Sequence, residues 1–158
     1  MTLAEKMIPI VRPRAAAVEQ AIDDVEDATL WSRLAPGVNP MGNLVLHLAG
    51  NLMKYIARGV GGRAYERDRP FEFQATGLPR ATVLARFREA TQAVIEVLGS
   101  VDAATLEAPY EGSEFGGQDK QSVMLHSIEH LGYHTGQLTL LAKLASLASD
   151  GSGTRRSE

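Results

Sequence analysis

Apolar residues recur along this chain at the three- and four-residue spacing that is typical of amphipathic helices. The spacing is clear at about residues 39–59, 80–98 and 119–149, and a fourth segment rich in helix-forming residues lies within residues 3–28. No segment alternates apolar and polar residues for long enough to indicate a β-sheet. The chain is therefore predicted to be all-α, and four amphipathic helices of this length predict a four-helix bundle.

Residues with a preference for helix ends place some of the boundaries. Asn39 suits the N-cap of the second helix, Pro40 suits its first helical position, and Gly59 suits the cap at its C-terminal end. The start of the first helix has two alternatives because of Pro9 and Pro13. A proline inside the helix would kink it, whereas a proline at the first helical position would place the start at Pro13.

Two long connections follow the second and third predicted helices, and they contain the stretches GRAYERDRPFEFQATG and LEAPYEGSEFGGQDK. Connections of this length are uncommon and are often functional. A chain of 158 residues suits a single domain, which we place at residues 1–149. Residues 150–158 (DGSGTRRSE) are polar and rich in Gly and Ser, so they are expected to form a disordered tail.

Composition excludes several classes of function. A formal net charge of −3 provides no bulk attraction to nucleic acid, and no nucleic-acid partner is expected. The chain has no cysteine, so a metal would be held by His, Asp or Glu, and a reducing cytoplasmic location is expected. No stretch approaches the roughly 20 apolar residues that span a bilayer, and no membrane partner is expected.

The stretch HSIEHLGYH contains two overlapping metal-binding patterns. His126 and His130 flank Glu129 as in the H-x-x-E-H motif of one class of zinc protease, whereas His130 and His134 form a chelating pair one helical turn apart. The protease motif needs a third ligand well downstream. No histidine follows His134, and the only acidic residues after it lie in the expected tail, so the second pair is favoured. The alternative for any of these histidines is a hydrogen-bonded core residue.

The direction of these side chains follows from the helical advance of about 100° per residue. His126, His130 and His134 then fall within about 80° of one another, on what the leucine pattern predicts to be the core-facing side. That side also carries Leu131, Leu138, Leu141 and Leu144. Thr135 falls on the opposite side. His130 and His134 lie nearer the centre of the predicted apolar face than His126 does.

The remaining histidine, His47, lies on the second predicted helix, at the boundary of its apolar face and one turn before Asn51. A helical bundle can bring this boundary against the last helix. Three histidines from two helices, with one position left for water, are typical of catalytic rather than structural zinc sites.

The stretches HLAGN and EHLGYHTGQL resemble segments of the DinB/YfiT-like superfamily of metal-binding proteins, and RDRPFEF and LPRATVLARFREA resemble one branch of it. The resemblance extends from about Leu30 to Leu144. It implies a four-helix bundle with a divalent metal held by three histidines. On this sequence the implied ligands are His47, His130 and His134.

The resemblance also implies a function. Some members of the superfamily use low-molecular-weight thiols, as transferases or as a thiol-dependent isomerase, and homodimers are common among them. We therefore expect a divalent-metal-dependent enzyme with a small-molecule substrate, either a thiol-dependent S-transferase or a hydrolase, that forms a homodimer. Zinc is the expected metal, and nickel, manganese and iron are the alternatives. A non-enzymatic dimeric bundle with a structural or vestigial metal site, acting in a stress response or in binding, is the alternative function.

Other residues are assigned supporting roles. Residues close to the implied ligands are expected to orient the imidazoles. These are Asn51, His126, Tyr133 and Gln137. Three arginines in the first long connection form a candidate site for an anionic substrate, although a solvated loop is the alternative. These are Arg63, Arg67 and Arg69. Thr135 stands where many members of the superfamily have an arginine, so the role of that arginine is not assigned to this chain. No residue is identified as a general base.

Overall fold

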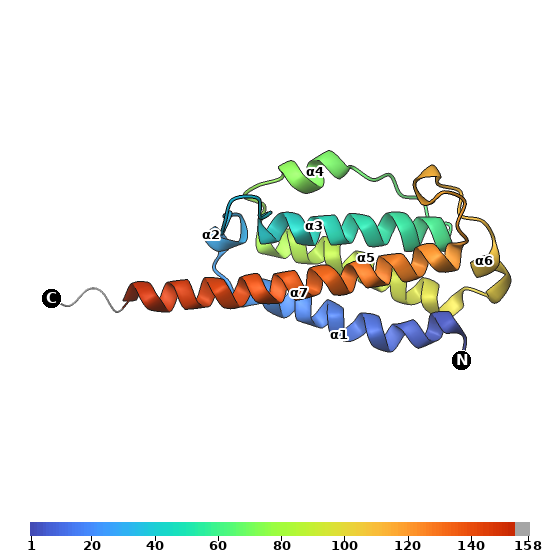
Figure 1. Ribbon diagram of the computed structural model, residues 1–158, viewed down its shortest axis with the longest axis horizontal. Helices are drawn as coiled ribbons and strands as arrows, with labels where there is room; N and C mark the ends of the chain where they lie inside the picture. The colour runs from blue at the N-terminus through green and yellow to red at the C-terminus, as the bar shows by residue number, and fades with distance from the viewer. Residues whose placement is uncertain (154–158) are drawn as a thin grey trace.

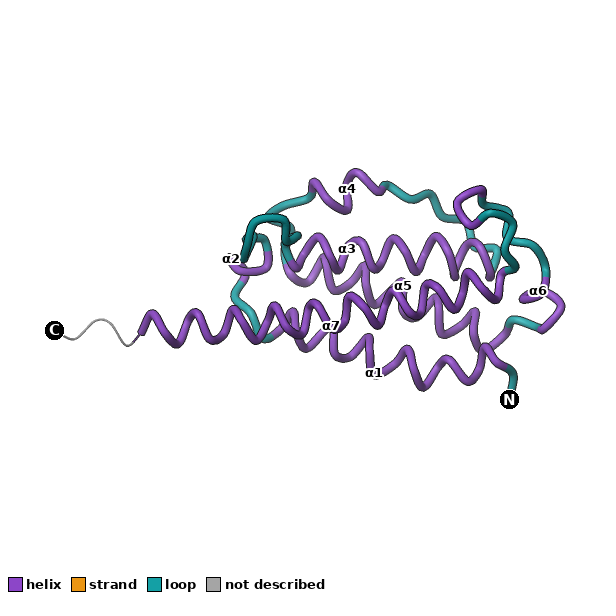
Figure 2. The backbone as a smooth tube through the Cα atoms, viewed as in Figure 1, coloured by secondary structure: helices purple, strands orange, loops and turns teal. Residues whose placement is uncertain are grey.

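Four long helical segments lie side by side in the computed structural model, which describes residues 1–153 and the side chains of residues 1–149 (Figure 1). They are α1 (Leu3–Asp23), α3 (Met41–Leu52) continued by the π-helix η1 (Met53–Val60), α5 (Arg80–Ser100) and α7 (Lys120–Gly153). The connections carry α2 (Asp27–Leu30), α4 (Arg69–Gln74), α6 (Ala103–Glu107) and the 3-10 turn η2 (Ser113–Phe115). The described residues contain no β-strand (Figure 2), which confirms the all-α prediction.

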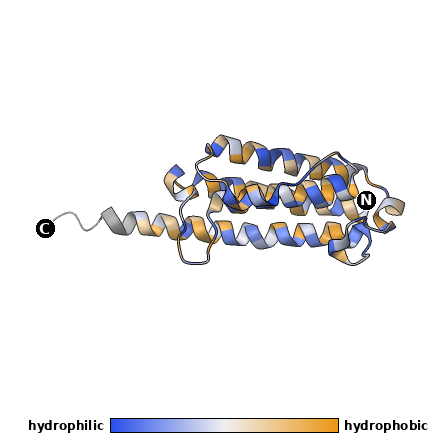
Figure 3. Cartoon of the chain, turned by 90° about the horizontal axis from the view of Figure 1, so that it is seen from above, coloured by the Kyte–Doolittle hydropathy of each residue, from blue (hydrophilic) through white to orange (hydrophobic). Residues whose placement is uncertain are grey.

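The four long segments share one hydrophobic core. α3 packs against α5 and α7, and α1 packs against α5 and α7. Each helix contributes fully buried apolar side chains, such as Ile22 of α1, Leu48 of α3, Phe87 of α5 and Leu131 of α7. Burying one such side chain contributes about 1.5–3 kcal/mol, so the core is the main source of stability. Figure 3 shows hydrophilic and hydrophobic residues interleaved along the same helices, as amphipathic helices require.

α1 begins at Leu3 and contains both prolines, so the alternative of a later start at Pro13 is wrong. A capping box explains the early start. The Glu5 amide donates to the Thr2 hydroxyl at 3.1 Å, and the Thr2 amide donates to the Glu5 carboxylate at 2.6 Å. The missing amide hydrogens of the prolines weaken this helix, and its buried face, including Val11, offsets that loss.

The second long segment differs from its prediction at both ends. Pro40 rather than Asn39 occupies the N-cap position, and no side chain caps the helix there. At the other end the backbone changes to π-helical hydrogen bonding after Leu52 and continues past Gly59. Gly59 does not end the helix. It allows the Tyr110 ring to pack against the helix backbone, because a Cβ atom at this position would overlap that ring.

α7 projects beyond the other helices at its C-terminal end (Figure 1). Asp119 caps its start, where its carboxylate accepts a hydrogen bond from the Ser122 amide at 2.7 Å. The helix extends to Gly153 and so includes residues 150–153 of the predicted tail. The rest of that predicted tail, residues 154–158, lies outside the described residues. Among the described helices, none combines the length and apolar character that a membrane span requires.

α4 lies along the outer face of α3 and is fastened to it by a buried amide (Figure 1). The Asn43 side chain donates to the carbonyl oxygens of Glu72 and Ala75, at 2.9 Å and 2.8 Å. Asp68 caps the start of α4 by accepting from the Phe71 amide at 3.0 Å. The first long connection is therefore partly helical, and its helix is held directly over the middle of α3.

Candidate metal centre

Three histidines from two helices meet at one side of the bundle. His47 comes from α3, and His130 and His134 come from successive turns of α7. A ligand nitrogen from each lies within 4.8 Å of those of the other two. The Nε2 atoms of His47 and His130 are 3.2 Å apart, and the His130 and His134 ring centroids are 4.4 Å apart. These are the three histidines that the family resemblance implies as metal ligands, and the structure brings them together.

The spacing of these nitrogens suits a metal ion. Tetrahedral zinc with bonds of about 2.05 Å places its nitrogen ligands about 3.3 Å apart. The His47–His130 separation of 3.2 Å is close to this value. His130 Nδ1 is also buried without a hydrogen-bond partner among the described residues. An unsatisfied buried polar atom costs about 1–3 kcal/mol and calls for a partner such as a bound water molecule or ion.

The protonation of the cluster also suits metal binding. Burial and the neighbouring histidines lower the pKa of His130 to about 3. Burial lowers the pKa of His134 as well, although its hydrogen bond to Gln137 opposes the shift. Imidazole binds metals only in its neutral form. Both residues of α7 are therefore neutral, and available as ligands, at neutral pH.

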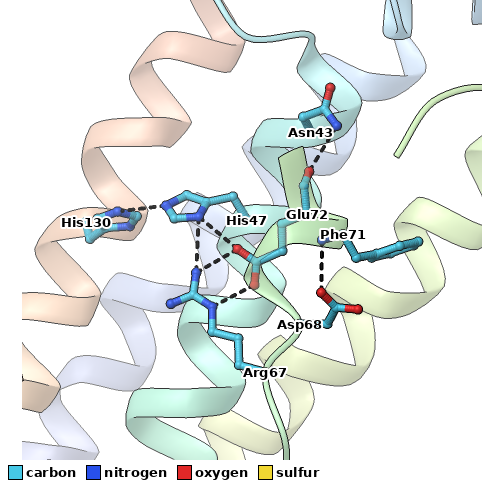
Figure 4. Close-up of polar contacts among 7 residues, drawn as sticks. All are labelled: Asn43, His47, Arg67, Asp68, Phe71, Glu72 and His130. Carbon is cyan, nitrogen blue, oxygen red and sulfur yellow. Dashed lines mark hydrogen bonds and ion pairs between the residues drawn. The ribbon is translucent and has the colours of Figure 1, made fainter. Parts of the chain in front are cut away.

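A carboxylate that sequence reasoning missed lies behind His47 (Figure 4). Glu72, at the centre of α4, places Oε2 3.0 Å from His47 Nδ1. Arg67 donates to both carboxylate oxygens, from Nε to Oε1 at 2.6 Å and from Nη2 to Oε2 at 2.7 Å. Burial alone would raise the pKa of Glu72, but the hydrogen bonds from His47 and Arg67 outweigh it and hold that pKa below its ordinary value. Glu72 is therefore ionised and acts only as an acceptor.

His134 has a different support, on its own helix. Its Nδ1 lies 2.6 Å from Gln137 Oε1, and the amide nitrogen of Gln137 donates to the Tyr133 hydroxyl at 3.1 Å. Because an amide oxygen only accepts, His134 carries its proton on Nδ1 and leaves Nε2 free. Two of the residues expected to orient the ligands, Tyr133 and Gln137, thus form one connected chain to His134.

The other two expected supporting residues are placed differently. His126 is exposed and outside the three-histidine group, with its ring 6.3 Å from that of His130 and 5.2 Å from that of Phe115. Asn51 is buried one turn beyond His47, and its Oδ1 atom has no partner among the described residues. Neither residue makes a hydrogen bond to a cluster histidine within the described part of the chain.

The buried face of α7 coincides only in part with the face that the leucine pattern predicts, since Leu131 and Leu138 are buried as expected but Leu144 is not. Thr135 is buried and donates a hydrogen bond from its hydroxyl to the Leu131 carbonyl at 2.7 Å, whereas Leu144 is largely exposed. The prediction is wrong in part because this helix carries leucines both toward the core and toward solvent, and because a back-bonded threonine can be buried. His130 and His134 consequently lie at the edge of the buried face rather than at its centre.

The three arginines of the first long connection do not act as one group. Arg63 forms an ion pair with Glu96, and Arg67 forms the ion pair with Glu72. Arg69 has no ion pair among the described residues, and its guanidinium lies 5.3 Å from the centre of the Phe73 ring. Only Arg69 is therefore left with its charge uncompensated by a carboxylate.

Comparison with known proteins adds the family. A sequence model of the DinB superfamily matches residues 12–138. The chain belongs to the DinB superfamily. The matched region contains all three clustered histidines as well as Arg67 and Glu72. No curated protein sequence matches the chain. Membership of the DinB superfamily and the three-histidine cluster together are compatible with a metal-binding site.

Proposed function

We propose that this DinB-superfamily protein is a divalent-metal-dependent enzyme, in which His47, His130 and His134 hold the metal inside a four-helix bundle. The observation that carries the proposal is the convergence of three imidazoles at a half-exposed edge of the core. Three protein ligands leave a position for a small molecule, as in catalytic rather than structural zinc sites. We propose zinc as the metal, because three neutral imidazoles suit it.

We propose that the reaction is a thiol-dependent S-transfer. A bound divalent metal would lower the pKa of a water molecule or a thiol in the remaining position. Glu72, the carboxylate beside the cluster, binds His47 and Arg67 through its oxygens and is not free to act as a general base for hydrolysis. The chain also has no cysteine, so no thiolate of its own competes for the metal. These two features favour a thiol, rather than a water molecule activated by a general base, as the nucleophile at the metal.

Arg69 and Phe73 are the proposed contacts for the rest of the substrate. The Phe73 ring lies 4.9 Å from the His47 ring, and the Arg69 guanidinium lies over the Phe73 ring. A guanidinium without an ion pair among the described residues, separated from His47 by the Phe73 ring, suits a carboxylate on the substrate. We therefore propose a small thiol that bears a carboxylate, and we limit the anion-binding role to Arg69.

We also propose a homodimer in the cytoplasm. α7 carries a stripe of exposed apolar side chains, which we call the α7 stripe, and a monomer leaves it in contact with water. Its members and exposed fractions are Tyr133 (59%), Leu140 (57%), Leu144 (49%) and Leu147 (67%). Exposed apolar residues aligned on one helix face are typical of association surfaces. The lack of cysteine supports a reducing compartment.

The metal content of purified protein and the spectrum of its cobalt-substituted form test the proposed function. We expect close to one divalent metal per chain, and cobalt to give the visible absorption of a tetrahedral site with a thiolate charge-transfer band after addition of mercaptoacetate. Protein without stoichiometric metal would refute the metal site. A filled site whose cobalt spectrum does not respond to any thiol would refute the S-transferase and favour a structural metal.

A further inference from the structure

The segment RDRPFEF at residues 67–73 contributes no ligand to the histidine cluster, yet it places an ion pair in the protein interior. The side chains of Arg67 and Glu72 are only 8% and 5% exposed. Burying two charges costs free energy that their mutual attraction often only balances, so a buried pair is weak evidence for a stabilising role. A role tied to its position, behind His47, explains it better.

The contacts of this pair decide where His47 carries its proton. Both carboxylate oxygens of Glu72 accept hydrogen bonds from Arg67, so in the 3.0 Å contact with His47 the carboxylate accepts and Nδ1 donates, which requires a proton on Nδ1. Arg67 Nη2 lies 3.1 Å from the same nitrogen, but it is also 2.7 Å from Glu72 Oε2 and donates there. With Nδ1 protonated, Nε2 of His47 carries a lone pair, and this lone pair faces His130.

Gly50 makes the arrangement possible. Gly50 is the glycine of the HLAGN stretch (residues 47–51), and it lies on α3 where the Glu72 carboxylate approaches the helix. A Cβ atom there would overlap Glu72 Oε1 and lie 2.7 Å from its carboxyl carbon and 3.2 Å from Arg67 Nε. These atoms belong to the Glu72 and Arg67 side chains, which two charged hydrogen bonds join, and neither side chain can move away without breaking those bonds.

The backbone of α4 is equally constrained. The Asn43 amide holds the carbonyl oxygen of Glu72 itself, at 2.9 Å, so the segment cannot retreat from α3 to make room (Figure 4). Any side chain larger than hydrogen at position 50 must therefore displace the carboxylate from His47.

We propose that Arg67 and Glu72 are positioning residues for the metal, holding His47 with its proton on Nδ1 and its Nε2 toward the metal, and that Gly50 is the position that admits them. This inference rests on the proposed metal function. The HLAGN and RDRPFEF stretches then act together. HLAGN supplies the ligand His47 and the space at Gly50, and RDRPFEF supplies Glu72, the acceptor for the His47 proton. Acceptors behind metal-bound histidines typically contribute 10–100-fold to metal affinity.

Two variants and one control test the proposal. Gly50→Ala displaces the pair. Arg67→Met combined with Glu72→Leu removes it while filling the space, and such apolar replacement of a buried ion pair commonly preserves the fold. Gly99→Ala is the matched control, because a Cβ atom at this helical glycine has no neighbour closer than Ile8 Cδ1 at 4.0 Å. Circular dichroism verifies that each protein is folded.

The two readouts are zinc affinity, from competition with a chelator, and the His47 tautomer in metal-free protein, from long-range proton–nitrogen NMR correlations. We expect both test variants to bind zinc about 10–100-fold more weakly and to lose the Nδ1-protonated tautomer of His47, with the control unchanged. Adding Gly50→Ala to the double replacement should cause no further loss of zinc affinity, because both changes act through the Arg67–Glu72 pair.

Wild-type affinity together with the Nδ1-protonated tautomer in both folded test variants would overturn the proposal, even if the metal site itself is real. Wild-type protein that binds no zinc would instead refute the proposed function. The tautomer measurement on metal-free protein still decides the positioning role in that case, because loss of the Nδ1 proton in the variants alone supports it and an unchanged tautomer overturns it.

Discussion

The Nε2 atoms of His47 and His130 lie 3.2 Å apart, although 83 positions separate these residues in the sequence. Because Glu72 fixes the proton of His47 on Nδ1, this approach is either an N–H···N hydrogen bond from His130 or the meeting of two lone pairs on one metal ion. A third imidazole, His134, within 4.8 Å favours the second arrangement. Metal analysis of the histidine variants and the effect of a chelator on stability distinguish the two.

Replacing His47, His130 or His134 with Ala should each reduce the metal content sharply, since each removes one of three protein ligands. His126→Ala should retain the metal with at most a 10–100-fold loss of affinity, because its exposed ring lies outside the group. Metal content of the four variants under identical zinc supply is the measurement. An emptied site in His126→Ala with a filled site in His134→Ala would show that the H-x-x-E-H pair is the metal-binding one.

Metal removal should lower the stability of the wild-type protein and not of the His47→Ala variant. A ligand present at 100 times its dissociation constant stabilises a folded protein by about 2.7 kcal/mol. We expect a chelator to shift the thermal unfolding midpoint of the wild-type protein downward by several degrees, as measured by circular dichroism. Equal midpoints with and without zinc would indicate that the histidines form only a hydrogen-bonded core cluster.

Gln137→Ala should weaken zinc binding by about 10–100-fold, because it removes the acceptor that orients His134. Gln92→Ala is the control, since that side chain makes a comparable hydrogen bond to Glu96 on α5. Chelator competition measures both variants. If Gln137→Ala and Gln92→Ala bind zinc equally well, the helix alone is sufficient to orient His134.

Arg69→Ala should remove any preference of the cobalt-substituted protein for mercaptoacetate over mercaptoethanol. The first thiol carries a carboxylate for the Arg69 guanidinium to bind, and the second does not. Arg63→Ala is the control, because Arg63 is already paired with Glu96. Titration of the charge-transfer band gives both affinities. A preference that survives in Arg69→Ala would assign anion recognition to another residue.

Leu140→Glu combined with Leu147→Glu should dissociate the proposed dimer, because it places two charges on the α7 stripe. Light scattering at micromolar concentration should change from about twice the chain mass of 17.0 kDa to the chain mass itself. Leu34→Glu, at an exposed leucine outside α7, is the control. A wild-type protein that already scatters as a single 17.0 kDa chain would refute the homodimer.

The part of the site on α7 can be predicted from the sequence, because its residues lie within one or two helical turns of one another. The i, i+4 spacing of His130 and His134 places both imidazoles on one side of any helix, and Gln137 lies one turn from His134 for the same reason. Helical periodicity likewise predicts the long helices, whose apolar faces are determined by residues a few positions apart. His47 has no such local signal, and the family resemblance and its place at the boundary of an apolar helix face predicted that it joins the pair.

Helical periodicity did not determine which face of α7 is buried. Apolar residues occur around much of this helix, so periodicity alone does not separate leucines that meet α1 and α3 from those that face solvent. Contacts with the other helices bury Thr135 and leave Leu144 exposed. Helix packing therefore decided how exposed the histidine cluster is.

The support behind His47 depended entirely on the tertiary structure. Glu72 lies in a short helix within a charged connection, 25 positions from His47, and no local pattern distinguishes it from a solvated glutamate. Its role arises because Asn43 fastens α4 across α3 and because Gly50 leaves space for a carboxylate. The sequence by itself determined the long helices and the pairing of His130 with His134 on one of them, since these depend on neighbours a turn away. Only the packing of distant segments decided which carboxylate contacts His47.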